Sequence, residues 1–400
     1  MHRLHLFALA LTCTMGTVVP TTHGQDRPVR PAVAPDDAAV QERLRRYREH
    51  TAEQERERLA PAAHMRAARL YSPPSGPVEV LVRGGAATES HTLLLLDAQG
   101  EVLSLARIEP GRVDLLAALP ALATLDRAAW VQLAQDERPV GTPIVVQPLL
   151  EPPPVRTMRA TRPTGGAEYT KVVGWGKEPL DTSDEAMKAL AATWIEGDPP
   201  ILSGFRTYAE MDALIRSDHG EIRIAFSPDE APATVWNFRT LTREGFFDAG
   251  GFHRVVPVDR EGRPFVIQGG DPTLTGNGGP GYALPLEPSR LPHDYGVISM
   301  ARADEPHSAG SQFFIALGRE GCARLDGQYC AFGYAVEGNR TIDSIAASKI
   351  ADVATGRPET IPKILTVRLV EAPSRMPGID RRASCVKPSV PAGHPTPTGR

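Results

Sequence analysis

Cysteine is scarce in this sequence of 400 residues. The chain has four cysteines and no Cys-x-x-Cys pair, which excludes a disulfide-rich scaffold and a zinc ribbon. An excess of one charge is also missing, because 44 Lys and Arg face 48 Asp and Glu for a formal net charge of -4. This balance excludes a strongly basic protein that binds nucleic acid, and it provides no polybasic surface for a membrane.

Familiar catalytic motifs are absent as well. The chain contains no Gly-x-Ser-x-Gly, no P-loop and no His-Glu-x-x-His, and its His residues do not have the spacing of metal ligands. Residues 276–281 formally match Gly-x-Gly-x-x-Gly. A dinucleotide site would need a helix to begin there, which Pro280 and Pro285 prevent. We therefore expect neither a cofactor nor a metal.

No apolar run reaches the roughly 18 residues that a membrane-spanning helix needs. The apolar run from Leu4 to Leu11 follows His2 and Arg3 and precedes small and polar residues, which predicts a cleaved secretory signal over residues 1–24. We expect the mature chain to be exported, to the periplasm or the extracellular space, without stable membrane insertion after cleavage of the signal. Such a compartment is oxidising and permits disulfides.

The rest of the chain divides by composition. Residues 25–76 are predicted to be a loose Pro-rich segment followed by a charged, solvated helix that ends near Leu70. Residues 77–150 contain short apolar or alternating runs between turn signals, which predict a small β-rich domain without a catalytic constellation. Residues 151–200 are predicted to be a Pro-rich linker and a helix that starts at a capping box, and residues 373–400 a disordered Pro-rich tail.

Residues 201–372 are more regularly punctuated. Alternating strands, such as the one around Ile222, Ile224 and Phe226, are interrupted by two segments with helical spacing, at residues 234–242 and 341–347. Many short strands with two isolated helices predict a closed β-barrel that helices cap, rather than a sheet with crossover connections.

The residues that carry chemistry lie in five short segments of this domain. In one-letter code the segments read FHRVVP (252–257), FVIQGGDP (265–272), SMARA (299–303), SAGSQFFI (308–315) and LDGQYCAFG (325–333). Apolar residues alternate in them with a few polar ones, namely Arg254, Gln268 and Gln312. Together with the aromatic residues Phe314 and Tyr329, they predict a groove for an apolar peptide side chain, with hydrogen-bond donors directed at the peptide backbone.

In their amino acids and in their order along the chain, these segments resemble the cyclophilin-type peptidyl-prolyl cis–trans isomerases over residues 216 to 372. The resemblance implies a mainly β fold, an eight-stranded antiparallel β-barrel capped by two helices, here preceded by the small β-rich domain. It implies that Arg254 is catalytic and that Gln268 is its partner. It also implies a set of substrate-binding residues: Phe265, Val266, Phe314, Leu325 and Tyr329 in the proline pocket, and Gly276, Ala301, Arg302 and Gln312 along the peptide groove.

The function that the resemblance implies is rotation of X–Pro peptide bonds in exported or folding proteins, so that the partners are proline-containing peptides and unfolded proteins. The alternative is a proline-peptide-binding or scaffold protein with a non-catalytic cyclophilin domain. The presence of both Arg254 and Gln268 favours catalysis.

The sequence departs from the familiar members of that family at several places near the expected site. Residues 259–263 form an extra excursion. In addition to that insertion, His307 stands where an Asn is common, Arg324 stands where the best-known eukaryotic members carry Trp, and Tyr329 replaces their His. Cys322 and Cys330 flank the turn at residues 325–327, and in an oxidising compartment this proximity predicts a disulfide between them.

Overall fold

The computed structural model describes residues 63–84, 90–161, 168–195 and 200–385. The predicted signal, most of the loose segment with its charged helix, and the last fifteen residues of the tail lie outside the described residues. The described chain forms two units that alternate along the sequence. Of the described residues, the first unit takes those in 63–152, 181–210 and 371–383, and the second takes those in 153–180, 211–370 and 384–385.

The first unit is the predicted β-rich region. Its larger sheet has the strand order β2 (Tyr71–Ser72), β13 (Leu202–Ala209), β9 (Ile144–Leu150), β7 (Ala129–Gln135), β4 (His91–Leu96) and β5 (Val102–Ile108), with β8 (Arg138–Pro139) beside β7. A second sheet consists of β1 (His64–Ala67), β3 (Glu79–Arg83) and β6 (Gly111–Asp114), which leads into α2 (Leu115–Ala118) and η2 (Pro120–Thr124). Alternate residues of β3, Val80 and Val82, are fully buried in a core that both sheets share.

Three predicted boundaries of this region need correction. Residues 64–67 form β1, where a helix was expected up to Leu70, because they pair with β3 in register. Strand β13 was assigned to the barrel, but it pairs with β9 and β2. Residues 373–383 were expected to be disordered. They fold in the first unit, with η4 (Arg381–Ser384) at their end, because Arg375 is buried against Glu210.

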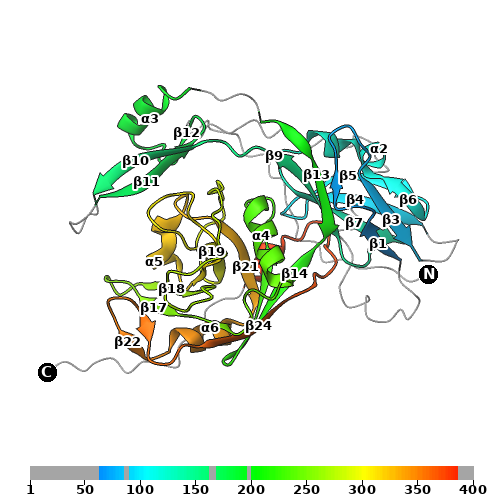
Figure 1. The fold of residues 1–400 in the computed structure, drawn as a ribbon. Coiled ribbons are helices and arrows are strands. Elements are labelled where there is room, and N and C mark those ends of the chain that lie inside the picture. Colours follow the sequence, from blue (N-terminus) through cyan, green and yellow to red (C-terminus); the bar gives the residue numbers. More distant parts are fainter. Residues whose placement is uncertain (1–62, 85–89, 162–167, 196–199, 386–400) are drawn as a thin grey trace, which may run out of the picture. The chain divides into compact units, whose positions relative to one another are not determined.

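The second unit is a curled β-sheet, the predicted barrel (Figure 1). Its strand order is β16 (Gly250–Gly251), β24 (Lys363–Glu371), β14 (Met211–Ser217), β15 (Gly220–Phe226), β21 (Ala331–Glu337), β19 (Val297–Met300), β20 (Phe313–Ala316), β18 (Pro264–Gly269) and β17 (Arg254–Val258). The first and last strands of this order are separated in sequence only by Phe252 and His253. The sheet therefore returns to its own beginning, and β16 and β17 count as one bent strand of an eight-stranded barrel.

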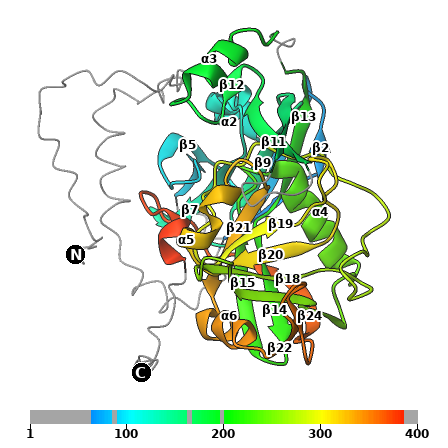
Figure 2. The same ribbon diagram turned by 90° about the vertical axis from the view of Figure 1, so that its left-hand side faces the viewer.

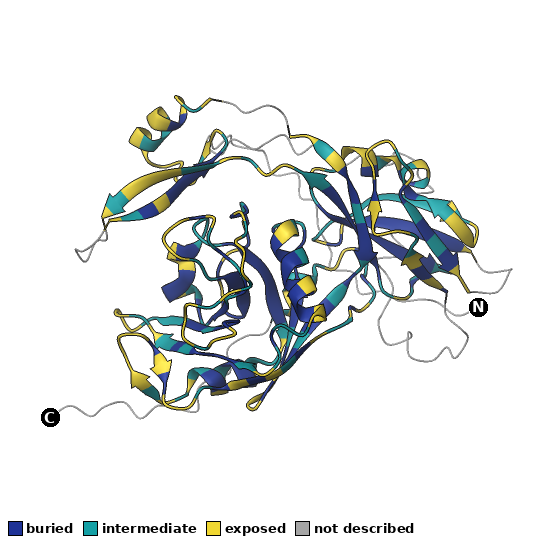
Figure 3. Cartoon of the chain, viewed as in Figure 1, coloured by how far each residue is buried: buried dark blue, intermediate teal, exposed yellow. Residues whose placement is uncertain are grey.

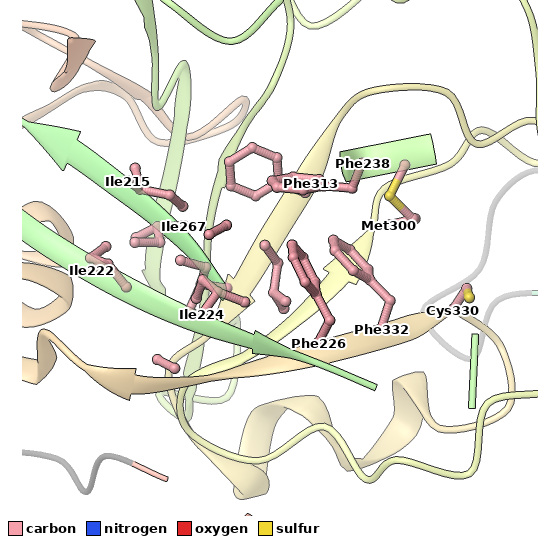
Figure 4. Close-up of a cluster of buried hydrophobic side chains, with 14 of the residues drawn as sticks. Ile215, Ile222, Ile224, Phe226, Phe238, Ile267, Met300, Phe313, Cys330 and Phe332 are labelled. Atoms are coloured by element: carbon pink, nitrogen blue, oxygen red, sulfur yellow. The ribbon is translucent and has the colours of Figure 1, made fainter. Parts of the chain in front are cut away.

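Two helices cap this barrel at opposite ends, as Figures 1 and 2 show. Helix α4 (Pro232–Arg243) begins with a proline, whose missing N–H costs nothing at that position, and it buries Phe238. Helix α6 (Asn339–Ala346) buries Ile342 and Ile345. Figure 4 shows the interior, where Phe238 meets Phe226, Phe313 and Phe332 at ring distances of 5.3–5.8 Å.

The segment predicted as a linker forms a hairpin of the second unit. Strand β10 (Val155–Thr161) pairs with β11 (Glu168–Trp175), which pairs with the short β12 (Glu178–Pro179). The expectation of a linker was wrong because the Arg and Thr residues of β10 hide the strand in the sequence. The strand forms because β11 pairs with it along its length. Val172 and Trp175 of β11 belong to the same buried cluster as the barrel core. The helix predicted after the linker is α3 (Glu185–Ala191), which Asp184 caps.

The remaining elements of the second unit are α5 (Arg319–Cys322), η3 (Ala323–Leu325) and the pair β22 (Ile350–Asp352) and β23 (Arg357–Pro358). Figure 3 shows that the barrel strands are mostly buried, whereas β10 is mostly exposed. No helix in the described part of the chain is long and apolar enough to cross a membrane.

Candidate active site

The two faces of the barrel sheet carry different kinds of side chain: one is apolar and the other is partly polar. Val255, Ile267, Ile315 and Ile298 are opposite one another on β17, β18, β20 and β19, and they belong to the barrel core. The next row across the same strands consists of Arg254, Gln268, Phe314 and Ser299. Because neighbouring residues of a strand point to opposite faces, this second row lies outside the core. The register of the strands and their alternation together place the predicted catalytic residues in one row with a predicted pocket residue.

A series of hydrogen bonds connects Arg254 and Gln268 of this row to Gln312, the residue just before β20. The Arg254 Nη1 donates to Gln268 Oε1 at 3.1 Å, and the Gln268 Nε2 donates to Gln312 Oε1 at 3.0 Å. The Gln312 Nε2 donates in turn to the carbonyl oxygens of Gly276 and Gly278 at 2.9 and 2.8 Å. The guanidinium is thus held in one orientation, and burial lowers its pKa without removing its charge.

The loop that receives these bonds is ordered by Asp271. Its carboxylate accepts hydrogen bonds from the N–H and the hydroxyl of Thr273, at 2.7 and 2.8 Å, and from the N–H of Gly276. Burial by itself raises the pKa of Asp271, but the donors at Thr273, Gly278 and Gly276 outweigh it and lower the pKa to about 2. A Cβ at Gly278 would lie 2.1 Å from the Asp271 carboxylate, so only glycine fits there.

The predicted proline-pocket residues gather in a cluster separate from the barrel core, here called the site cluster. Its buried members are Val266, Phe314, Ala316, Cys322 and Leu325, and Phe265, Ala301 and Tyr329 pack against them. The rings of Phe314 and Tyr329 meet edge to face at 5.7 Å. All six predicted apolar site residues are therefore together, next to the row of Arg254 and Gln268.

Arg302, the remaining predicted residue, uses its side chain within the chain itself. Its guanidinium donates to the carbonyl oxygens of Gln328, Ala303 and Asp304 at 2.8–2.9 Å. It also lies 4.9 Å from the centre of the Tyr329 ring. Arg302 thus borders the site cluster and fixes the loop around it.

Sequence reasoning missed the polar group behind Phe314. The His293 ring stacks on Phe314 at 5.7 Å, its Nδ1 lies 2.9 Å from Asp326 and its Nε2 lies 2.9 Å from the Ser299 hydroxyl. The Ser299 and His293 side chains are buried, so they support Phe314 from behind. The sequence contains no direct signal for this group. The pairing of Ser299 with Phe314 identifies it only once the strand register is known.

The extra excursion of residues 259–263 is tied to Arg324. The Asp259 carboxylate accepts from Arg263 at 2.8 Å and from Arg324 at 3.0 Å. Burial opposes the ionised form, but these donors hold the pKa of Asp259 well below its usual range. The Arg324 guanidinium lies 4.6 Å from the centre of the Phe265 ring. The insertion and the unusual Arg324 therefore act together at the edge of the site cluster.

The predicted disulfide between Cys322 and Cys330 is not present, and that expectation is corrected. Both residues are buried free cysteines in different clusters, because the strand after the turn directs Cys330 into the barrel core. The Cys322 thiol contacts the carbonyl of Phe265 at 3.1 Å, and the Cys330 sulfur lies 3.3 Å from the Thr234 hydroxyl. Burial raises the pKa of Cys322 to about 11.

Among the residues that the structure describes, no group of three His, Cys, Asp or Glu side chains is arranged to hold a metal ion.

Comparisons with known proteins concern the second unit. Residues 212–369 match the family model "Cyclophilin type peptidyl-prolyl cis-trans isomerase/CLD". A peptidyl-prolyl cis-trans isomerase of Synechococcus elongatus is 44% identical over 121 residues, which are 30% of this chain and 77% of that protein. Peptidyl-prolyl cis-trans isomerase B of Bacillus subtilis is 42% identical over 127 residues, 31% of this chain and 82% of that protein.

Among solved structures, the chain is similar to a cyclophilin type peptidyl-prolyl cis-trans isomerase of Cryptosporidium parvum, crystallised in the presence of the dipeptide Ala-Pro. The two are 28% identical, and the match covers 40% of this chain and 99% of that one with a TM-score of 0.37.

Proposed function

The chain belongs to the cyclophilin-type peptidyl-prolyl cis–trans isomerase family, and from this premise we propose that it catalyses X–Pro rotation in exported or folding proteins through Arg254. It is a peptidyl-prolyl cis–trans isomerase. The observation that carries the residue assignment is the row in which Gln268 accepts a hydrogen bond from the Arg254 guanidinium and is itself paired with Phe314 on the next strand.

The barrier to X–Pro rotation is amide resonance, about 18–20 kcal/mol. In the twisted transition state this resonance is lost, and the proline nitrogen carries a localised lone pair. A guanidinium that donates to this nitrogen stabilises the transition state more than the planar ground state, which is the requirement for catalysis. Arg254 is suited to this role because it stays charged and because Gln268 fixes its fork.

The site cluster has the complementary role of holding the proline ring. Phe314, Leu325 and Tyr329 offer apolar and aromatic surface, and Phe314 is paired across the sheet with Gln268, the partner of Arg254. With the ring held there and the peptide backbone bound along Gln312 and Ala301, the part of the substrate before the proline rotates. No nucleophile and no transfer of a proton is needed, since no covalent bond other than the partial double bond changes.

The exported location rests on the sequence of residues 1–24 alone, with Leu4 to Leu11 as the apolar run. Clients of the enzyme are then proline-containing segments of proteins that fold after export. Its partners are peptides and unfolded chains rather than nucleic acid.

The proposal is tested on the full chain with a peptide that contains one X–Pro bond. Exchange spectroscopy is expected to show faster cis–trans exchange with catalytic amounts of enzyme, and N-terminal sequencing of protein from the secreting cell is expected to begin near residue 25. Peptide binding without faster exchange would instead support the non-catalytic alternative, and an intact N-terminus would refute export by a cleaved signal.

A further inference from the structure

The hairpin of β10, β11 and β12 is held against two loops that border the site cluster. Gln328 accepts a hydrogen bond from the Val172 N–H at 3.0 Å and donates one to the Val172 carbonyl at 2.7 Å. Asp304 accepts from the Thr170 N–H at 2.9 Å and from its hydroxyl at 3.2 Å, and Arg159 of β10 donates to the same carboxylate at 3.1 Å. The donor at Thr170 lowers the pKa of Asp304, so the carboxylate is ionised.

These contacts use the backbone edge of β11. Both backbone groups of Val172 bond to Gln328, so at this residue the strand presents its hydrogen-bonding edge away from β10. An unpaired strand edge needs partners, because a buried N–H or C=O without one costs free energy. Here the partners are side chains of the barrel loops: an amide that imitates the edge of a neighbouring strand, and a carboxylate two residues along.

Apolar contacts fix the same hairpin to the second unit. Val172 and Trp175 are buried in the barrel cluster. Next to the turn before Gln328, a Cβ at Gly327 would lie 2.7 Å from a methyl group of Leu180. Gly327 also has a φ of +68°, in the left-handed region that favours glycine. The hairpin is therefore packed as well as hydrogen-bonded at this loop.

Both loops lead directly to residues of the site. Gln328 precedes Tyr329, and its carbonyl accepts from the Arg302 Nε at 2.9 Å. The Arg302 guanidinium lies over the Tyr329 ring and also bonds to the carbonyl of Asp304. A displacement of Gln328 or Asp304 would consequently move both the Tyr329 ring and the cation that covers it.

We propose that the β10–β11–β12 hairpin is a positioning element of the proline-binding side, and that Gln328 and Asp304 are the positioning residues through which it acts. The hairpin lies outside the residues 212–369 that match the family model, so this device is an addition to the barrel. The proposal rests on the isomerase activity described above. According to this proposal, the β10–β11–β12 hairpin, although outside the family domain, helps to hold the proline ring.

The test compares variants of the full chain in a steady-state isomerase assay, at a temperature where circular dichroism shows them folded. Gln328→Ala is expected to raise KM for an X–Pro peptide about three- to tenfold, the loss expected for roughly one net hydrogen bond, while kcat stays within about twofold. The reason is that the ring is held in the ground state and the transition state alike. Gln328→Glu, which keeps the acceptor but loses the donor, is expected to raise KM in the same direction and replaces Gln328→Ala if that variant does not fold.

Asp304 provides the conservative comparison. Asp304→Ala is expected to raise KM, whereas Asp304→Asn keeps an acceptor for the Thr170 N–H and is expected to recover most of the loss. Lys171→Ala is the matched control, since Lys171 is an exposed residue of β11 between the two contacts.

Two results would overturn the positioning role: folded Gln328 variants whose KM lies within 1.5-fold of the parent, or an equal rise of KM in Lys171→Ala. A merely structural role of the hairpin would lower the unfolding temperature of the Gln328 variants without changing KM. An inactive parent chain would refute the isomerase assignment instead, so the two failures are distinguishable.

Discussion

Arg254 shows how much of the site depends on single side chains. Its guanidinium gains orientation from Gln268, and Gln268 is fixed by Gln312, whose amide is fixed by two glycine carbonyls. The side-chain amides of Gln268 and Gln312 each donate and accept, so the direction of every hydrogen bond in this series is set. A charge placed in this way needs no reorganisation when the proline nitrogen changes its geometry.

We expect Arg254→Ala to lower kcat and kcat/KM together by about ten- to a hundredfold, the equivalent of a charge-assisted hydrogen bond made in the transition state. Arg254→Lys should recover little, because an ammonium on a flexible stem does not reproduce the fork. Exchange spectroscopy measures the rates.

Arg216→Ala serves as the control for this prediction, since Arg216 is an exposed arginine of β14 paired with Glu221. The mechanism fails if folded Arg254→Ala isomerises at the parent rate.

The loop of residues 271–278 is the element that connects the barrel to the peptide groove. Asp271 at its start binds the N–H groups of Thr273 and Gly276, and Gln312 binds the carbonyls of Gly276 and Gly278. Its shape is therefore determined by one carboxylate and one amide, and Gly276 adopts a φ of +90° that side chains disfavour.

The contribution of this loop to the stability of the fold should depend on pH. The folded pKa of Asp271 is about 2, below the value of about 3.9 in an unfolded chain. The ionised carboxylate therefore stabilises the fold fully at pH values above about 4. The contribution is lost as the pH falls from about 4 towards 2. Asp271→Asn should lower the free energy of unfolding by about 1.5–3 kcal/mol at pH 7.

Urea unfolding at pH 7, 4 and 2.5, followed by fluorescence, measures this difference. The gap between Asp271→Asn and the parent should narrow as the pH is lowered. A gap that is the same at all three values would mean that the charge of Asp271 does not stabilise the loop.

For the whole molecule, the course of the chain matters as much as its strands. The chain leaves the first unit, forms the hairpin of the second, returns for β13, and returns again after the barrel with residues 371–383. The last return is held by Arg375, which makes two hydrogen bonds to Glu210 at 2.8 and 3.0 Å and lies 3.7 Å from the centre of the Trp130 ring. Both charged groups are buried, and Arg381 also donates to the Glu210 carboxylate at 3.0 Å.

Arg375→Ala should destabilise the first unit by about 3–5 kcal/mol, because it leaves the Glu210 carboxylate buried without its main partner. Thermal unfolding is expected to show an earlier transition. The X–Pro rate below that transition should be unchanged, since the site residues belong to the second unit. Arg112→Ala, which removes an exposed ion pair with Glu79, should shift the transition little.

The same transition temperature in Arg375→Ala and the parent would show that the segment of residues 371–383 contributes nothing to the first unit.

The barrel and its two capping helices could be predicted from the sequence, and the same motifs supplied the residues that we propose for the site. Strand alternation placed Ile222 and Ile224 inside, and the motifs around Arg254, Gln268 and Phe314 identified the family. These features could be predicted because they depend on local period and on short segments whose residues act at fixed spacing.

Features that depend on contacts between distant segments could not be read from the sequence. The polar strand β10 has no pattern of its own and forms because β11 pairs with it, and Gln328 and Asp304 then bind that hairpin. Arg375 lies in a stretch with the composition of a disordered tail, yet Glu210 buries it. Cys322 and Cys330 are near one another in sequence, but the fold directs them into separate clusters. The physical reason is common to these cases: a buried charge, an unpaired strand edge or a thiol is satisfied by whichever partner the fold brings near, and sequence distance does not encode that partner.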